Sequence, residues 1–367
     1  MVRLGDVCTF YSGTGFPNIY QGKADGKYPF YKVGDISRNV LSGNRELKIC
    51  ENYIDDDTVT KIKGTLLPPQ TVVFAKIGEA LRLNRRAITS RDCLVDNNAM
   101  GIKSDDSIID SLYFYYFMCN VDLQNYCEST TVPSVRKTRI AEIEIPLPPL
   151  DEQRRIAAVL DKVSDLIAKR REQLDKLDEL VKARFVEMFG DPINNTKGLP
   201  TTPLGEICYL KAGVTTASDE IHSQSKEYSV PCYGGNGIRG YVKEATQRGT
   251  YPIIGRQGAL CGNVQLAIGE FHATEHAVLV SPIIKTNVIW VYYLLKFMDL
   301  YRYHTGAAQP GLAVKTLNMV EIPCADIGLQ NEFATFAEQV EKSKLTIQQS
   351  LDKLEVLKKA LMQQYFG

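Results

Sequence analysis

The sequence predicts an α+β protein in which two homologous mixed domains are separated by two long helices that form an antiparallel coiled coil with pseudo-twofold symmetry. Three observations predict it: an internal repeat, heptad-spaced apolar residues at the end of each copy, and short β-rich runs ahead of them. The 367 residues also exceed what one hydrophobic core usually fills, which favours more than one domain.

The internal repeat is clearest at its carboxyl end. Residues 174–190, LDKLDELVKARFVEMFG, align without a gap with residues 351–367, LDKLEVLKKALMQQYFG, at an offset of 177 residues. Upstream the offset rises to 180, where Lys76 aligns with Arg256, and then to 200 near the start of each copy. The first copy is therefore 23 residues longer, and its front half diverges more than its back half.

The front half of each copy is predicted to be a compact α+β domain, at residues 1–149 and 191–327. Short β-rich runs such as 251–254 lie between glycine-bearing loops. Each copy also carries one aromatic helix candidate, 112–118 in the first and 289–297 in the second.

The back half of each copy is predicted to be a long helix, at residues 150–190 and 328–367. In the first copy Pro148 and Pro149 prevent an earlier helix, and Gly190 ends it. At about 1.5 Å per residue, a helix of roughly 39 residues is on the order of 58 Å long. Such a helix needs a partner along its length.

Apolar residues recur along both helices at alternating spacings of four and three, interrupted by charged residues such as Arg170 and Arg184. This spacing is typical of a coiled-coil seam. Because two homologous seams in one chain can cover each other, we expect an antiparallel helix pair. The residues expected to pair the helices are Ile156, Leu160, Val163, Ile167, Leu174, Leu177, Val181, Val340, Ile347, Leu351, Leu354 and Leu361.

Composition and charge exclude several classes of protein. Lys plus Arg and Asp plus Glu both number 43, so the net charge of zero gives no global attraction to polyanions. The longest run without a charged residue is 13 residues, too short to cross a bilayer as a helix, and the amino terminus does not resemble a secretory signal. We expect no membrane association, a cytoplasmic location, and nine reduced cysteines, since no C-x-x-C pair occurs.

An antiparallel helix pair would relate the two domains by a pseudo-twofold axis. Duplex DNA also has twofold axes perpendicular to its length, so two related domains held apart could read two separated half-sites. If both docked on one face of the duplex, the half-site centres would lie about 34 to 36 Å apart. The predicted helices are long enough for that spacing.

Three sequence patterns resemble the specificity subunit of type I restriction-modification systems. They are LGDVCTFYSGTGFP at 4–17, EIPLPPLDEQRRIAAVLDKVSDLIAKR at 144–170 and TGAAQPGLAVKTLNMVEIP at 305–323. The resemblance implies two target recognition domains alternating with two helical spacers, each domain reading half of an interrupted DNA sequence. It also implies that this chain is not catalytic.

The resemblance further implies partner subunits. A DNA methyltransferase (modification) subunit using S-adenosylmethionine would flip out and methylate an adenine in each half-site of double-stranded DNA. A restriction/translocase subunit would use ATP and Mg to move along unmodified DNA and cut it, so no cofactor is expected in this chain. One departure is that TTVPS at 130–134 stands where the second copy has AAQPG at 307–311, so a role for Gln309 does not transfer to the first domain.

The most basic window of the sequence lies at 76–91 and contains a single acidic residue next to its arginines, Glu79. Arginine can grip phosphate or read guanine edges bidentately, so this window is interpreted either as a DNA contact or as a solvated loop. The candidate DNA-binding residues of this window are Lys76, Arg82, Arg85, Arg86 and Arg91.

The second domain offers comparable candidates in Arg239, Lys243, Arg256 and Gln257. Gln and Arg are the side chains that most often read bases. Lys76 and Arg256 occupy the same repeat position, which indicates a shared role, either phosphate contact or a structural pairing.

Two strings imitate catalytic motifs. Gly235, Gly237 and Gly240 satisfy G-x-G-x-x-G, but no helical pattern follows, as a dinucleotide site requires. His272 and His276 belong to an H-x-x-E-H string, which binds zinc only when both histidines share a helical face, and its context favours a strand.

Three alternatives remain open. The chain could serve a fused nuclease-methyltransferase of a related two-component system, it could be a coiled-coil scaffold that does not bind DNA, or it could be a metalloenzyme built on His272, Glu275 and His276. We expect no metal and no catalytic residue.

Overall fold

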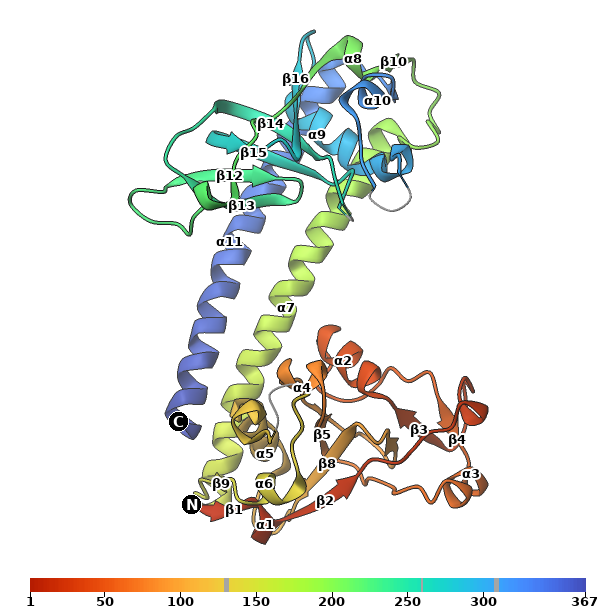
Figure 1. Ribbon diagram of the computed structural model, residues 1–367, viewed down its shortest axis with the longest axis vertical. Coiled ribbons are helices and arrows are strands. Elements are labelled where there is room, and N and C mark those ends of the chain that lie inside the picture. The colour runs from red at the N-terminus through yellow and green to blue at the C-terminus, as the bar shows by residue number, and fades with distance from the viewer. Residues whose placement is uncertain (129–131, 259, 307–309) are drawn as a thin grey trace. The chain divides into compact units, whose positions relative to one another are not determined.

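The computed structural model describes residues 1–128, 132–258, 260–306 and 310–367. It consists of two compact units. The first unit comprises Met1–Arg171 and Gln349–Gly367, and the second comprises Glu172–Gln348. Each unit thus contains one mixed domain and a part of both long helices, whose elements are labelled in Figure 1.

The first unit is built on an antiparallel four-stranded sheet in the order β2-β8-β5-β6. Strand β5 (VVFA) is buried along its whole length, as a continuous apolar run in the middle of a sheet predicts. The bounds are β2 Cys8–Ser12, β8 Ala99–Ser104, β5 Val72–Ala75 and β6 Ala87–Ile88.

Two smaller sheets complete the strands described in the first unit. One has the order β4-β3-β7, in which β3 and β7 are parallel, and the other pairs the start of the unit with its end. The bounds are β4 Tyr53–Ile54, β3 Tyr28–Tyr31, β7 Leu94–Val95, β1 Val2–Arg3 and β9 Glu144–Ile145.

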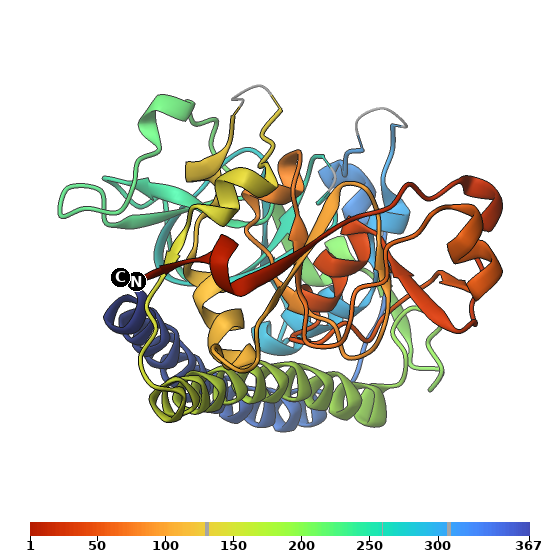
Figure 2. The ribbon, with the colours of Figure 1, turned by 90° about the horizontal axis from the view of Figure 1, so that it is seen from below.

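Helix α5 (Ser111–Asn120) is the main helix of this domain, and it lies against α7 (Figures 1 and 2). It begins where the Asp110 carboxylate accepts the backbone N–H groups of Leu112 and Tyr113, both at 3.0 Å. The other helices are α1 Leu4–Val7, α2 Val33–Leu41, α3 Asp56–Lys61, α4 Glu79–Arg82 and α6 Lys137–Ala141, with short 3-10 turns at Asn18–Tyr20 and Leu123–Tyr126.

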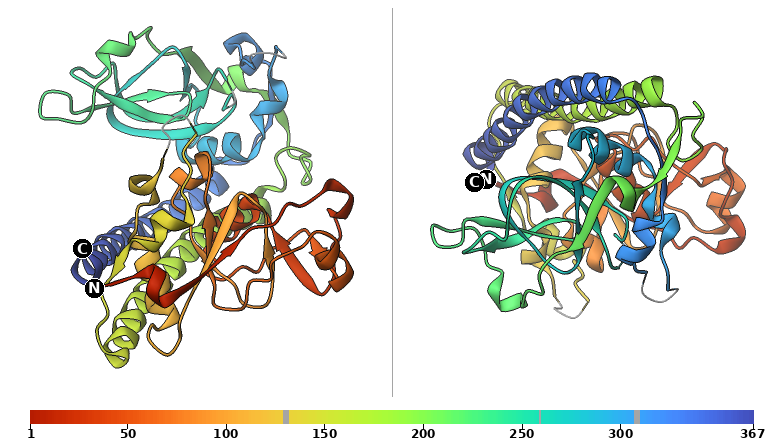
Figure 3. Two further views of the ribbon diagram at one scale, coloured as in Figure 1. Left: turned by 60° about the horizontal axis from the view of Figure 1, so that its bottom comes forward. Right: turned by 90° about the horizontal axis from the view of Figure 1, so that it is seen from above.

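The second unit is built on a six-stranded sheet in the order β11-β16-β14-β15-β12-β13, drawn in green and teal in Figure 3. Its neighbours are antiparallel except β12 and β15, which are parallel, like β3 and β7 in the first unit. The bounds are β11 Cys208–Ala212, β16 Ala277–Pro282, β14 Gln247–Gly255, β15 Val264–Ala273, β12 Val230–Gly234 and β13 Gly237–Val242, and a separate pair joins β10 Thr201–Pro203 to β17 Glu321–Pro323.

Helix α9 (Val288–Phe297) occupies the place in the second unit that α5 has in the first. The Asn287 side chain caps it by accepting the N–H groups of Ile289 at 2.9 Å and Trp290 at 3.2 Å. The remaining helices are α8 Leu204–Ile207 and α10 Val314–Asn318, with 3-10 turns at Ser218–Glu220 and Leu300–Tyr303.

The two long helices are α7 (Leu150–Phe189) and α11 (Ile327–Phe366). None of the helices in the described ranges is long and apolar enough to cross a membrane. Within the first unit Arg171 of α7 pairs with Glu355 of α11 at 2.6 Å, while Leu160 packs in the same core as Met362. The α11 partner number falls as the α7 number rises, so the two helices are antiparallel there.

The same holds within the second unit. Lys344 of α11 pairs with Asp178 of α7 at 2.9 Å, and Arg184 of α7 pairs with Glu332 at 2.9 Å. The predicted α+β class, with two homologous mixed domains and two long antiparallel helices, is therefore confirmed.

The twelve predicted seam residues are all buried or half-buried. The helices pair with each other as expected, and each also packs on its domain. In the first unit the Tyr116 hydroxyl of α5 donates to Asp161 of α7 at 2.9 Å, and in the second the Tyr293 hydroxyl of α9 donates to Glu341 of α11 at 3.0 Å. Phe185, which the heptad spacing left outside the seam, is fully buried against Phe297 and Phe333.

Candidate nucleic-acid interface

A short extended segment follows strand β5 in the first unit and is held by three backbone hydrogen bonds. The Lys76 N–H donates to the Asn98 carbonyl at 2.8 Å, and the Lys76 carbonyl accepts the Val135 N–H at 3.0 Å. The Gly78 N–H donates to the Pro133 carbonyl at 2.8 Å. Gly78 has a φ of 75°, a backbone conformation that favours glycine, so the chain turns away directly after the segment.

The second unit repeats this arrangement after β14. The Arg256 N–H donates to the His276 carbonyl at 2.9 Å, and the Arg256 carbonyl accepts the Leu312 N–H at 2.8 Å. The Gly258 N–H donates to the Pro310 carbonyl at 3.0 Å, and its φ is 79°. We call the segments Lys76–Gly78 and Arg256–Gly258 the platforms of the two units.

Each platform presents a half-buried cation followed by an exposed residue of different chemistry. Lys76 and Arg256 are half-buried, whereas Ile77 is 37% exposed and Gln257 is exposed. The middle residue of each platform forms an antiparallel bridge, Ile77 with Ser134 and Gln257 with Gly311. Because successive side chains of extended chain point to opposite sides, the cation and the following residue face different surroundings.

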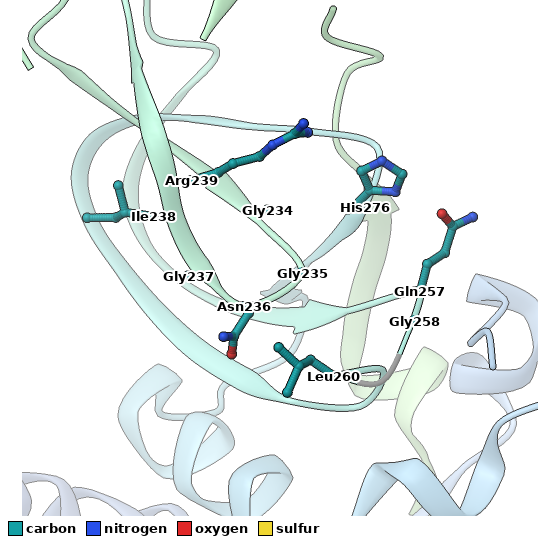
Figure 4. Close-up of a pocket in the computed structure, with 10 residues that line it drawn as sticks. All are labelled: Gly234, Gly235, Asn236, Gly237, Ile238, Arg239, Gln257, Gly258, Leu260 and His276. Carbon is teal, nitrogen blue, oxygen red and sulfur yellow. The ribbon is translucent and has the colours of Figure 1, made fainter. Parts of the chain in front are cut away.

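In the second unit the platform borders a pocket of about 590 Å³. The turn between β12 and β13 forms its floor, and the backbones approach closely there, since a Cβ on Gly255 would lie 2.1 Å from the Gly235 carbonyl oxygen. Figure 4 shows the side chains of Arg239, His276 and Gln257 along one side of this pocket. The lining residues are Gly234, Gly235, Asn236, Gly237, Ile238, Arg239, Gln257, Gly258, Leu260 and His276.

The two other cations predicted in this unit have carboxylate or hydroxyl partners. Arg239 is exposed and donates to the Ser218 hydroxyl at 3.1 Å. Lys243 pairs with Glu227 at 2.6 Å, and this hydrogen bond raises the pKa of Lys243. Arg239 is therefore the better placed of the two to meet an anionic ligand at the pocket.

The H-x-x-E-H string does not form a metal site. His272 lies in β15, and its Nε2 is 2.8 Å from the Thr216 hydroxyl, while burial lowers its pKa. Glu275 and His276 lie in the turn before β16, where Glu275 accepts the Thr216 N–H at 3.2 Å. Across the described residues no group of three His, Cys, Asp or Glu side chains could hold a metal ion. The string Gly235, Gly237 and Gly240 lies on the β12–β13 hairpin, without a following helix.

Arg86 corrects the prediction for the basic window of the first unit. It is 3% exposed, its Nη2 donates to Asn84 Oδ1 at 2.6 Å, and its guanidinium lies 5.0 Å from the centroid of Phe74. Burial lowers its pKa to about 10. Arg86 is therefore buried in the domain and does not lie on the surface where the prediction placed a DNA contact.

The other residues of the window do not form one patch with it. Arg82 pairs with Glu79 at 3.0 Å within α4, and Arg91 donates to the Lys27 carbonyl. Arg85 is half-buried. Gln309 lies outside the described residues.

Sequence reasoning missed Ile77 and Asn98. Ile77 carries neither a charge nor an amide group, and the nearness of Asn98 to Lys76 arises from strand pairing rather than from sequence spacing. The available signal was the repeat register, which aligns Ile77 with Gln257. The equivalence of Asn98 and His276 follows from their matching hydrogen bonds to Lys76 and Arg256.

A family model, described as the type I restriction modification DNA specificity domain, matches residues 1–178 and again residues 197–358. The two matches cover most of the chain and agree with the duplication seen in the sequence and in the two platforms.

Curated relatives carry the same description. The specificity subunit of the Escherichia coli type I restriction enzyme EcoprrI is 31% identical over 318 residues, which is 82% of this chain and 76% of that protein. The MjaVIII specificity subunit of Methanocaldococcus jannaschii is 25% identical over 214 residues, 56% of this chain and 45% of that protein.

Two solved structures share the fold. The S subunit of a type I restriction-modification system from M. genitalium aligns with a TM-score of 0.61 at 17% identity, over 100% of this chain and 95% of that chain. A chain from a structure described as the complex assembly and conformational transition of the type I R-M system aligns with a TM-score of 0.53 at 18% identity, over 100% and 96%.

Proposed function

Because the chain belongs to the type I restriction-modification DNA specificity family, as a specificity subunit, we propose that each of its two units reads one half of an interrupted sequence in double-stranded DNA. The subunit is not itself an enzyme. A specificity subunit selects a DNA sequence. This requires contacts to bases that discriminate between sequences and contacts to phosphates that hold the protein in register.

The observation that carries the proposal is the duplicated platform. Lys76 and Arg256 make the same backbone hydrogen bonds in two domains whose other loops differ. The two domains keep a cation at one position and differ at the next. This suits two half-sites that have the same sugar-phosphate backbone but different base sequences.

The net charge of zero agrees with this reading, because neutrality requires contacts to be local. A protein that held DNA by its overall field would bind every sequence with similar strength. Here a few cations next to exposed, chemically distinct side chains favour a sequence-specific contact over a general one.

The proposed partners are a DNA methyltransferase subunit, which would methylate an adenine in each half-site, and a restriction/translocase subunit. S-adenosylmethionine would bind to the first, and ATP and Mg to the second. The long helices are the surfaces we assign to these partners, since exposed leucines remain on them, including Leu180 at 47% and Leu357 at 46%, which share a repeat position.

The test is to co-express the chain with its methyltransferase partner and to locate modified adenines across the host genome by sequencing. We expect an interrupted motif with two specific halves separated by a fixed gap. A continuous motif, or no motif from an assembled complex, would overturn the proposal. DNA affinity of the complex that did not fall with salt would favour a scaffold without DNA contact.

A further inference from the structure

Resting on the proposed function, we propose that the middle residue of each platform determines the base read at one position of each half-site. Ile77 is this residue in the first unit and Gln257 in the second. The preceding cations, Lys76 and Arg256, contact phosphate and do not specify sequence.

The backbone geometry makes the two positions equivalent. Three hydrogen bonds of 2.8 to 3.0 Å fix each platform to the same two neighbouring segments, and an antiparallel bridge holds the middle residue. The side chains at positions 77 and 257 therefore extend from equivalent backbone positions in the two domains. Any difference in what the two positions contact comes from the side chains themselves.

The cation position has the chemistry of phosphate contact. Lysine is a point charge, whereas arginine has a planar fork that can bind a guanine edge bidentately. Both satisfy a phosphate oxygen equally well, so a position that accepts Lys76 in one copy and Arg256 in the other fits the sugar-phosphate backbone.

The middle position has the chemistry of base reading. A glutamine such as Gln257 can donate to and accept from N7 and N6 of adenine, and an isoleucine such as Ile77 can pack on the methyl group of thymine. Both residues are solvent-exposed, although an exposed isoleucine gains nothing from water. An isoleucine in this place offers an apolar surface that a thymine methyl group can pack on.

The pocket beside Gln257 gives a base edge room to approach. Gln257 lines it with Arg239 and His276, and the hairpin glycines Gly234, Gly235 and Gly237 add no side chains to the lining (Figure 4). In the first unit β3 is instead followed by helix α2, so the two units differ in the element that follows this strand. We expect Gln257 to read adenine and Ile77 to contact thymine.

The experiment uses the complete complex with the methyltransferase and measures the modified motif for Ile77→Ala, Gln257→Ala and the matched surface control Gln224→Ala. For Gln257→Ala we expect one position of one half-site to lose discrimination by roughly 5- to 150-fold, with the other half-site unchanged. For Ile77→Ala we expect one position of the other half-site to lose discrimination. Gln224→Ala, in an exposed loop, should keep the parental motif.

A variant that gains a new base preference must be folded, so it excludes misfolding as the reason why the alanine variants lose discrimination. Gln257→Glu should move the preference at its position towards cytosine, whose N4 amino group a carboxylate can accept. Lys76→Gln and Arg256→Gln should leave the motif unchanged, while each lowers affinity and makes the slope of log K against log salt shallower by about 0.9.

The outcomes separate this inference from the proposed function. If the unaltered complex modifies no interrupted motif, the proposed function is overturned. If it does, but Ile77→Ala, Gln257→Ala and Gln257→Glu all keep the parental base preferences, only the assignment of these positions is overturned. A changed motif in Lys76→Gln would overturn the assignment of the cation to phosphate.

Discussion

The buried side-chain amide of Gln153 accepts the backbone N–H of Asp110 at 2.9 Å, at the start of α5. Gln330 does the same for Asn287 at 2.9 Å, at the start of α9. Each glutamine also donates to a carbonyl just ahead of its own long helix, that of Pro148 at 2.9 Å or Ala325 at 2.8 Å. One buried side chain per unit therefore joins the cap of the domain helix to the first turn of a long helix.

We expect Gln153→Leu and Gln330→Leu to lower the free energy of unfolding by about 2 to 3 kcal/mol each, because buried backbone groups lose their partners. The measurement is urea unfolding followed by circular dichroism. Exposed Gln349, on α11, provides the control as Gln349→Leu, which should stay within about 0.5 kcal/mol of the parent. Equal stability of all three variants would show that these hydrogen bonds do not fix the helices.

Arg86 gives a second prediction, because a buried arginine has been separated from the DNA surface. Arg86→Ala removes the 2.6 Å hydrogen bond to Asn84 Oδ1 and opens a cavity over Phe74, while the Val121 carbonyl keeps the Asn84 amide as a donor. We expect a loss of about 3 kcal/mol in unfolding free energy. Arg86→Met keeps most of the volume and should recover part of that loss. Neither change should alter the salt dependence of DNA binding by the assembled complex, and a shallower slope for Arg86→Met would restore Arg86 as a phosphate contact.

His272 links the stability of the second unit to pH. Burial lowers the pKa of His272 in the folded state below its ordinary value of 6.5, so the unfolded chain binds the proton more readily. The stabilisation is fully present above pH 6.5 and is lost as the pH falls towards the lowered folded pKa, with a slope of up to about 1.4 kcal/mol per pH unit.

The measurement compares unfolding midpoints between pH 7.5 and pH 5 in the parent, His272→Gln and His304→Gln. We expect His272→Gln to reduce the slope below pH 6.5, whereas His304→Gln, which changes a half-buried histidine, should retain it. Parallel curves for the parent and His272→Gln would contradict the assignment.

The sequence predicted the repeated architecture because heptad spacing and the similarity of the two copies can be read without knowing which residues are in contact. It left Phe185 out of the buried face of α7, because the end of this helix packs on the core of the second domain. There Val181, Phe185 and Phe189 follow a spacing of four on the side of Trp290, and Arg184 pairs with Glu332 at the edge. Heptad spacing describes contacts between helices and does not predict the contacts of a helix with a neighbouring domain.

The site was harder to predict than the fold for the same reason. Charge alone grouped Arg86 with Lys76, yet strand β6 begins one residue after Arg86 and turns its side chain inward. The contact between Lys76 and Asn98 joins the ends of separate strands, so only the sheet register reveals it. Repeat alignment is the sequence signal that can predict such a contact. It does so only once the structure of one copy is known.

The last prediction separates Arg239 from Lys243, two exposed cations of the second unit that were predicted to contact DNA. Lys243 is held by Glu227, so contact with a phosphate would break an existing ion pair and release few counterions in net terms. Arg239 is held by the neutral Ser218 hydroxyl and carries its charge to the pocket, so contact with phosphate or a base costs no ion pair. In titrations of the assembled complex with cognate DNA at several salt concentrations, we expect Arg239→Ala to weaken binding and to reduce the salt slope by about 0.9, and Lys243→Ala to change neither measurably. The double variant Lys243→Ala with Glu227→Ala removes both charges and should behave like Lys243→Ala. A larger loss of affinity for Lys243→Ala than for Arg239→Ala would place the DNA backbone on the far side of the β12–β13 hairpin from the pocket.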